Sequence, residues 1–172
     1  LREKGVRTFI KDRPINEMWS GDDLSGWKEL ICGASQLPKN QAINMSKDGY
    51  SEVVWMPVFV TGSGPAHLED PIQPASARAG NFCRGAIGNI KTIAGYAYVC
   101  GGNRSLAKRI GDSAWESYSH FFKAPSDPTG SHGFQDVDGF SEQDIYLVGG
   151  IGDVWHFNGT KAKKLPFPFK TP

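Results

Sequence analysis

An apolar run that ends in a pair of glycines occurs twice in the second half of the chain. Residues 97–102 read Ala-Tyr-Val-Cys-Gly-Gly, and residues 145–150 read Ile-Tyr-Leu-Val-Gly-Gly, 48 positions later. Upstream of these runs, Ile90 and Ile93 correspond to Val137 and Phe140 at a displacement of 47. Downstream, residues 106–110 correspond to residues 153–157. Self-similarity at a fixed period of this length is typical of stacked repeats.

Each copy predicts a meander of short antiparallel strands. An apolar strand buried on both faces comes first, followed by a Gly-Gly turn that needs a positive φ. The next strand alternates: residues 154–157 read Val-Trp-His-Phe, which places Val and His on one face and Trp and Phe on the other. The dipeptide Asn158-Gly159 then predicts a type I′ hairpin turn. We therefore predict an all-β fold without a helical segment.

Weaker copies precede the two clear ones. One hairpin leads from Trp19 through a Gly- and Asp-rich turn to Trp27, and Trp115 holds the place of Trp27 in a later copy, 88 residues on. A second hairpin turns at residues 47–49 and continues as a strand over residues 52–61, and Gly62–Gly80 reads as an irregular loop. We expect one domain over residues 1–172 with four repeat units, at roughly 1–34, 41–80, 86–125 and 133–170.

Composition limits the classes of partner. A chain of 172 residues suits one domain, and 21 Gly with 11 Pro imply many tight turns. The formal net charge of +1 argues against nucleic acid or an anionic membrane as the partner, and no run of about 18 apolar residues could span a bilayer. The start, Leu-Arg-Glu-Lys, lacks the apolar core of a signal peptide, so we expect a missing or processed N-terminus. Three irregularly spaced cysteines favour a reducing compartment such as the cytoplasm, although the sequence leaves the compartment open.

The glycine pairs resemble those of kelch-type β-propeller blades, in which an apolar strand and Gly-Gly precede an aromatic residue and a Trp. The matching positions are Gly101, Gly102 and Trp115 in one copy, and Gly149 and Gly150 in the other. The second copy lacks the Trp. The resemblance implies propeller-like repeats amounting to three or four blades. The chain would then be a partial propeller, part of a larger ring, or one of several copies that complete a ring.

Residues 20–27, Ser-Gly-Asp-Asp-Leu-Ser-Gly-Trp, resemble the Asp-box turn of sialidase-like propellers, with Leu in place of a glycine. That family binds a substrate carboxylate through three arginines. The first family motif is reversed here, as Arg13-Pro14-Ile15, but Arg84, Arg104 and Arg109 could supply cations if they converged. A sialidase-like or other glycan-processing enzyme is therefore one alternative, and a lectin-like carbohydrate-binding propeller is another.

Motifs for catalysis or for a bound cofactor are missing. The four histidines have no metal-ligand spacing, and neither a Gly-x-Ser-x-Gly elbow nor a phosphate-binding Gly-rich loop occurs. The strongest titratable cluster, His67, Glu69 and Asp70, lies in the long loop. We expect no metal and no cofactor.

The leading interpretation is a non-enzymatic module that presents loops to a protein partner, with the Gly62–Gly80 loop and the Ser126–Gly133 connection as contact elements. The candidate binding residues are His67, Glu69, Asp70, Arg84, Arg104 and Trp155. The residues expected to maintain the repeat are Trp27, Gly101, Gly102, Trp115, Gly149 and Gly150.

Overall fold

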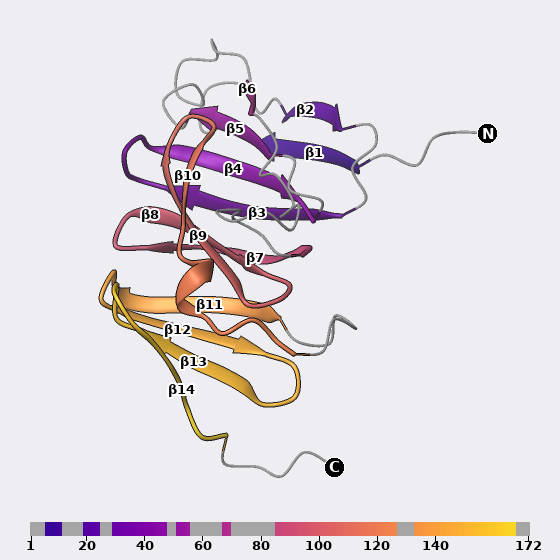
Figure 1. Cartoon of the computed structure of the whole chain (residues 1–172). Coiled ribbons are helices and arrows are strands. Elements are labelled where there is room, and N and C mark those ends of the chain that lie inside the picture. Colours follow the sequence, from indigo (N-terminus) through magenta and orange to yellow (C-terminus); the bar gives the residue numbers. More distant parts are fainter. Residues whose placement is uncertain are drawn as a thin grey trace, which may run out of the picture.

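A computed structural model describes residues 6–11, 19–24, 29–47, 51–55, 67–69, 85–126 and 133–167. Strands dominate the described part of the chain, and the strands of each sheet pair antiparallel (Figure 1). One single-turn 3-10 helix, η1 (Ser119–Phe121), follows the tenth strand. The predicted all-β class and the antiparallel meander are therefore confirmed.

The strands form a two-stranded hairpin and three four-stranded sheets, each with its strands in chain order. The hairpin consists of β1 (Val6–Lys11) and β2 (Trp19–Leu24). Sheet 1 consists of β3 (Leu30–Ser35), β4 (Gln41–Ser46), β5 (Ser51–Trp55) and β6 (His67–Glu69). Sheet 2 consists of β7 (Ile87–Ile93), β8 (Tyr96–Gly101), β9 (Ser105–Gly111) and β10 (Ala114–Ser117). Sheet 3 consists of β11 (Phe134–Ser141), β12 (Asp144–Gly149), β13 (Asp153–Phe157) and β14 (Ala162–Lys164).

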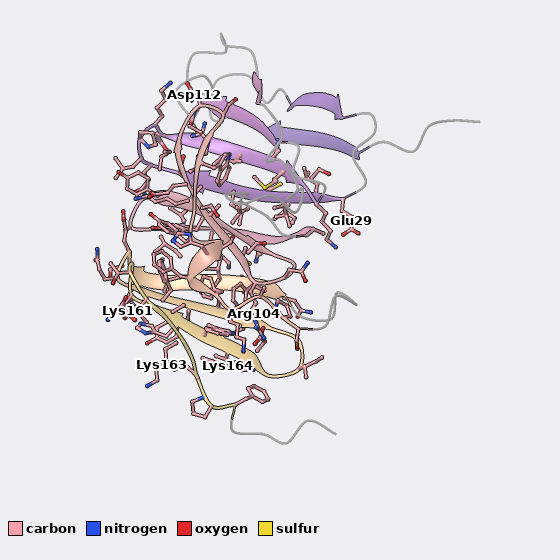
Figure 2. All side chains as sticks on the ribbon, in the orientation of Figure 1. Glu29, Arg104, Asp112, Lys161, Lys163 and Lys164 are labelled. Atoms are coloured by element: carbon pink, nitrogen blue, oxygen red, sulfur yellow. The ribbon has the colours of Figure 1, made fainter. Side chains whose placement is uncertain are left out.

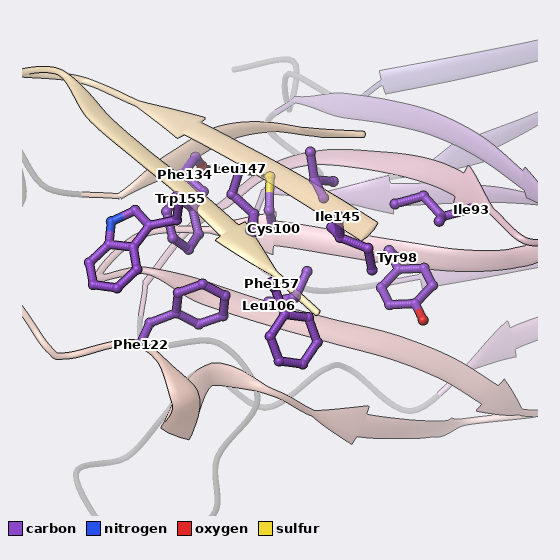
Figure 3. Packing of buried hydrophobic residues seen from close by; sticks show 11 residues of the cluster. Ile93, Tyr98, Cys100, Leu106, Phe122, Phe134, Ile145, Leu147, Trp155 and Phe157 are labelled. Atoms are coloured by element: carbon purple, nitrogen blue, oxygen red, sulfur yellow. Dashed lines mark hydrogen bonds between the residues drawn. The ribbon is translucent and has the colours of Figure 1, made fainter. Parts of the chain in front are cut away.

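The three sheets are stacked in chain order, so that sheet 2 lies between the other two (Figure 1). Strand β8 shows the consequence, because its side chains alternate between two cores. Ala97 and Val99 join Ile43 of sheet 1 in the first core. Tyr98 and Cys100 join the apolar side chains of sheet 3 in the second core (Figure 3). The expected burial of both strand faces is thus confirmed for β8.

Sheets 2 and 3 are structural copies. Tyr98 pairs with Lys108 across β8 and β9, and Tyr146 pairs with His156 across β12 and β13, at a constant displacement of 48 residues. Ser105 therefore corresponds to Asp153. The sequence alignment, which matched residue 106 with residue 153, was wrong by one residue in this strand.

The insertion that changes the displacement from 47 to 48 lies in β11. The pairing of β11 with β12 shifts register between Gly139 and Ser141, so Phe140 is an extra residue at a bulge. Its side chain is 88% exposed, whereas the Ile93 side chain is buried. Ile93 thus corresponds to Ser141, and its predicted match with Phe140 is wrong.

The glycine pairs serve close packing and not the turn itself. None of the four glycines has a positive φ; in the two turns the positive values lie at Asn103 and Arg104, and at Ile151 and Gly152. The prediction that the pairs supply positive φ is therefore wrong.

A Cβ atom at the first glycine of either pair would collide with the backbone of the neighbouring segment. At Gly101 it would lie 2.4 Å from the Ala86 carbonyl oxygen, and at Gly149 it would lie 2.0 Å from the Gly133 carbonyl oxygen. A missing side chain lets those segments approach. The role of both glycines in the repeat is therefore steric.

Three further expectations differ from the structure. Residues 20–24 belong to β2, which pairs with β1, so this half of the expected Asp-box turn is extended strand. β3 pairs with β4, so the expected boundary between residues 34 and 41 lies inside sheet 1. Gly159 has a positive φ, but β13 and β14 are joined by a four-residue loop between Phe157 and Ala162 and not by a two-residue type I′ turn.

The steric role of Gly149 predicts that Gly149→Ala destabilises the protein, because a Cβ would overlap a backbone carbonyl. We expect a loss of about 2 kcal/mol in the free energy of unfolding, measured by urea denaturation. Gly111→Ala is the matched control, since its Cβ would meet only the Ala114 Cβ at 3.5 Å. Equal stability of the two variants would contradict this interpretation.

Candidate functional site

Two equivalent turns meet at one end of sheets 2 and 3. We call this end the turn edge; it comprises residues 102–104 between β8 and β9, residues 150–152 between β12 and β13, and residues 122–126 after η1. Gly102 forms an isolated bridge with Gly133, which brings the start of β11 to the same edge. One predicted binding residue, Arg104, belongs to this edge, and a second, Trp155 of β13, is connected to it through Asp153.

Arg104 joins the two sheets through a bidentate ion pair with Asp153. Its Nε donates to Asp153 Oδ2 at 2.6 Å, and its Nη2 donates to Oδ1 at 3.0 Å. Its Nη1 donates to the Lys123 carbonyl oxygen at 2.7 Å, which fastens the segment after η1. Both charged side chains are buried. A planar guanidinium supplies the fork that such a bidentate contact needs.

Asp153 also receives two other donors from sheet 3. The Trp155 indole Nε1 donates to Oδ1 at 2.9 Å, and Lys164 Nζ lies 3.3 Å from the same oxygen. The Arg104 guanidinium stands over the Trp155 ring, 5.2 Å from its centroid. Burial raises the pKa of Asp153, but the hydrogen bonds from Arg104 and Trp155 outweigh it, so the pKa lies below its ordinary value. Figure 2 shows Arg104 and Lys164 on neighbouring parts of the fold.

The side chains of this cluster satisfy one another, because each donor is directed at the Asp153 carboxylate or at a backbone carbonyl oxygen. Its effect is to hold the two turns rigidly beside each other. Apolar side chains lie at the surface above it: Ile151 is 58% exposed and Phe167 is 43% exposed. Phe167 lies over Gly152, where a Cβ would come within 3.0 Å of its ring. The turn edge therefore presents exposed apolar groups on a rigid, charge-paired base, an arrangement suited to protein contact.

Two other cations link the sheets away from the turn edge. Lys108 of β9 donates to both carboxylate oxygens of Glu142, at 2.9 and 2.8 Å, and its Nζ lies 3.7 Å from the centroid of the Tyr96 ring. Arg109 is buried and donates to Gln41 of sheet 1 and to Asp112, at 2.5 and 3.2 Å.

The arginines of the glycan-processing alternative do not gather where the structure describes them. Arg104 is bound to Asp153, and Arg109 is bound to Gln41 and Asp112. Arg84 lies outside the described residues. No described contact therefore favours a shared carboxylate-binding centre.

The remaining predicted site residues are scattered. His67 and Glu69 lie in β6, the last strand of sheet 1, opposite Val53 and Ser51. Asp70 and Trp27 lie outside the described residues. As binding residues, all six candidates remain predictions. Trp115 is buried in the first core, and Trp155 lines the second core.

Sequence reasoning missed the acidic partners, Asp153 and Glu142. One feature of the sequence could have indicated Asp153. A carboxylate comes directly before the alternating residues 154–157, at the position equivalent to Ser105. Within the described ranges no group of three His, Cys, Asp or Glu side chains could hold a metal ion. No helix described there is long and apolar enough to cross a membrane.

Comparison with known proteins gives one curated relative at 28% identity. It is Immune protein Tsi7 of Pseudomonas aeruginosa, and the similarity extends over 140 residues, or 81% of this chain. Those residues make up 42% of Tsi7, so the chain spans less than half the length of that relative. No protein-family model matches the chain, and no solved structure matches it.

The buried ion pair predicts a large effect of removing its cation. Arg104→Met keeps most of the apolar volume but leaves the Asp153 carboxylate buried without its main partner. We expect a loss of about 3 kcal/mol in the free energy of unfolding, measured by urea denaturation. Lys123→Met, at an exposed position, is the control and should change stability by less than about 0.5 kcal/mol. A loss of the control's size in Arg104→Met would refute the interpretation.

The lowered pKa of Asp153 predicts acid sensitivity. A carboxyl whose folded pKa is depressed contributes stability above its unfolded pKa, about 3.9, and that contribution is lost as the pH falls through the folded pKa. Comparing wild type with Asp153→Asn by thermal unfolding should show a stability difference that is constant above about pH 5 and shrinks below about pH 4. A stability difference between wild type and Asp153→Asn that does not change with pH would contradict the lowered pKa of Asp153.

Proposed function

We propose that this chain is a non-enzymatic binding protein that engages a protein partner. The comparison that supports the proposal is its similarity to a protein named an immune protein. The observation that carries the proposal is the extent of the similarity, which covers 81% of this chain. Because the chain matches 42% of that relative, the activity and partner of the whole protein belong to the proposal as well.

The proposed scaffold is a β-propeller-like stack. Four-stranded meanders follow one another in chain order, and β7, the first strand of sheet 2, lies against β3 and β11, the first strands of its neighbours. First strands that adjoin along one line are the arrangement expected of blades around an axis. Glycines also permit close approach between sheets 2 and 3, since a Cβ at Gly88 would lie 2.4 Å from the Phe134 carbonyl oxygen and a Cβ at Gly133 would lie 2.7 Å from the Gly102 Cα.

The proposed contact surface is the turn edge. Its support is the pair of exposed apolar residues, Ile151 and Phe167, above the closed cluster of Arg104 and Asp153. The predicted Ser126–Gly133 connection begins and ends at this edge, since Gly133 bridges to Gly102. A rigid base lowers the entropy lost when a partner binds.

The test begins with a tagged chain returned to the cells that encode it, and proteins that co-purify are identified by mass spectrometry. The strongest candidate is then produced alone and titrated against the purified chain by calorimetry. We expect a complex of fixed stoichiometry with a Kd of about 1 µM or tighter.

Two exposed isoleucines provide a matched pair of variants. Ile151→Asp, at the turn edge, should weaken the complex at least about tenfold, because it places a charge in an apolar contact. Ile110→Asp, on β9 and 48% exposed, should leave the affinity unchanged. Failure of every candidate to form a reconstituted complex would refute the proposed function. A complex indifferent to Ile151→Asp would refute only the turn edge as its surface.

A further inference from the structure

The outer face of sheet 3 repeats a face that is buried in sheet 2. On β8, Tyr98 is 1% exposed and Cys100 is 0% exposed, because sheet 3 covers them. The corresponding residues of β12 are Tyr146 and Val148, which are 38% and 43% exposed. Alternate residues of β12, such as Leu147, face sheet 2. Among the described residues, sheet 3 thus has one face covered by sheet 2 and one face on which no other described sheet packs.

Opposite charges lie on the two outer strands of this face, β11 and β14. Residues directly opposite one another in neighbouring strands share a face. The pairs Asp138–Tyr146, Tyr146–His156 and His156–Lys163 therefore form one row across β11, β12, β13 and β14. The row begins with a carboxylate and ends with an ammonium group. Both end residues are exposed.

The row beside it is apolar at its centre, where Val148 pairs with Val154. His156 Nε2 lies 2.9 Å from Asp144 Oδ1, so these two side chains contact each other within the face. Lys161 lies close to Lys163 and adds positive charge on the β14 side (Figure 2). The face therefore has an acidic β11 side, a basic β14 side, and a centre in which Tyr146, Val148 and Val154 lie beside the contact between Asp144 and His156.

We propose that this face is a self-association surface, on which a second copy of the chain packs sheet 3 against sheet 3. A twofold axis parallel to the strands and lying between the two sheets brings β11 of one copy over β14 of the other. Asp138 of each copy then faces Lys163 of its partner, Tyr146 faces the partner's His156, and Val148 faces the partner's Val154. Isologous twofold contacts of this kind are the commonest in homo-oligomers, and face-to-face packing of sheets is a standard way to bury such side chains.

A second copy is proposed as the binding partner because of the sheet faces that one chain leaves exposed. Within one chain, the Tyr98 face of sheet 2 is covered by the inner face of sheet 3, which carries Ile145 and Leu147. In a second copy that inner face is already covered by its own sheet 2. The outer face of the second copy combines an exposed apolar centre with charges that are complementary after the rotation.

The first measurement is the molar mass of the whole chain by light scattering coupled to size exclusion, at concentrations from about 1 to 100 µM. Wild type should approach twice 18.8 kDa as the concentration rises. Val148→Asp should remain at 18.8 kDa throughout. Ile151→Asp and Ile110→Asp, at positions that are 58% and 48% exposed but lie outside the face, should behave as wild type. A wild type that stays at the mass of one chain at 100 µM overturns the inference.

A charge exchange tests the twofold geometry and does not depend on the stability of Val148→Asp. Asp138→Lys alone and Lys163→Asp alone should each raise the dimer Kd about tenfold, because like charges then face each other twice per dimer. The double variant should return the Kd to within about twofold of wild type. Both positions are exposed, so folding should be preserved, which circular dichroism checks.

A double variant no tighter than either single variant overturns the proposed axis and indicates a head-to-tail contact or a different partner on this face. The result is independent of the proposed function. Partner binding responds to Ile151→Asp and self-association responds to Val148→Asp, so either can fail while the other holds.

Discussion

The packing of one sheet onto the face of the sheet before it is the constraint on which the other features depend. A four-stranded meander with apolar residues on both faces is not covered by its own strands, and β8 gains two-sided burial only because sheets 1 and 3 flank it. Close stacking in turn requires the missing side chain at Gly88 of β7, where a Cβ would lie 2.4 Å from the Phe134 carbonyl oxygen of sheet 3. The apolar contact itself is non-directional, so it does not fix how one sheet is rotated on the next.

Ion pairs between neighbouring sheets fix the rotation of one sheet on the next. Arg104 and Asp153 fasten sheet 2 to sheet 3 at the turn edge, and Lys108 of β9 binds Glu142 of the turn between β11 and β12. Such pairs cost desolvation energy, so their contribution lies in fixing one arrangement more than in adding stability. The same rigidity holds exposed side chains such as Ile151 in place at the surface.

The sequence was sufficient for the features that depend on periodicity. The repeat of 48 residues, the meander and the two-sided burial of β8 all follow from apolar patterns. Features that depend on contacts between distant segments were not predictable. The glycine pairs look like turn residues unless the approach of Gly133 to Gly149 is known. The bulge at Phe140 is hidden because one extra residue looks the same in a turn and in a strand. Arg104 was predicted to be a binding residue, but its ion-pair partner Asp153 lies 49 positions away, and the sequence does not indicate that the two side chains meet.

The most direct test of this account compares two tyrosines that occupy the same place in consecutive sheets. Hydroxyl-radical footprinting read by mass spectrometry gives the oxidation rate of each side chain in the whole protein. In dilute solution Tyr98, 1% exposed, should be protected, and Tyr146, 38% exposed, should be oxidised several-fold faster. Equal oxidation rates at the two positions would mean that sheet 3 does not cover sheet 2, and would contradict the stacked arrangement from which the surfaces described above are derived.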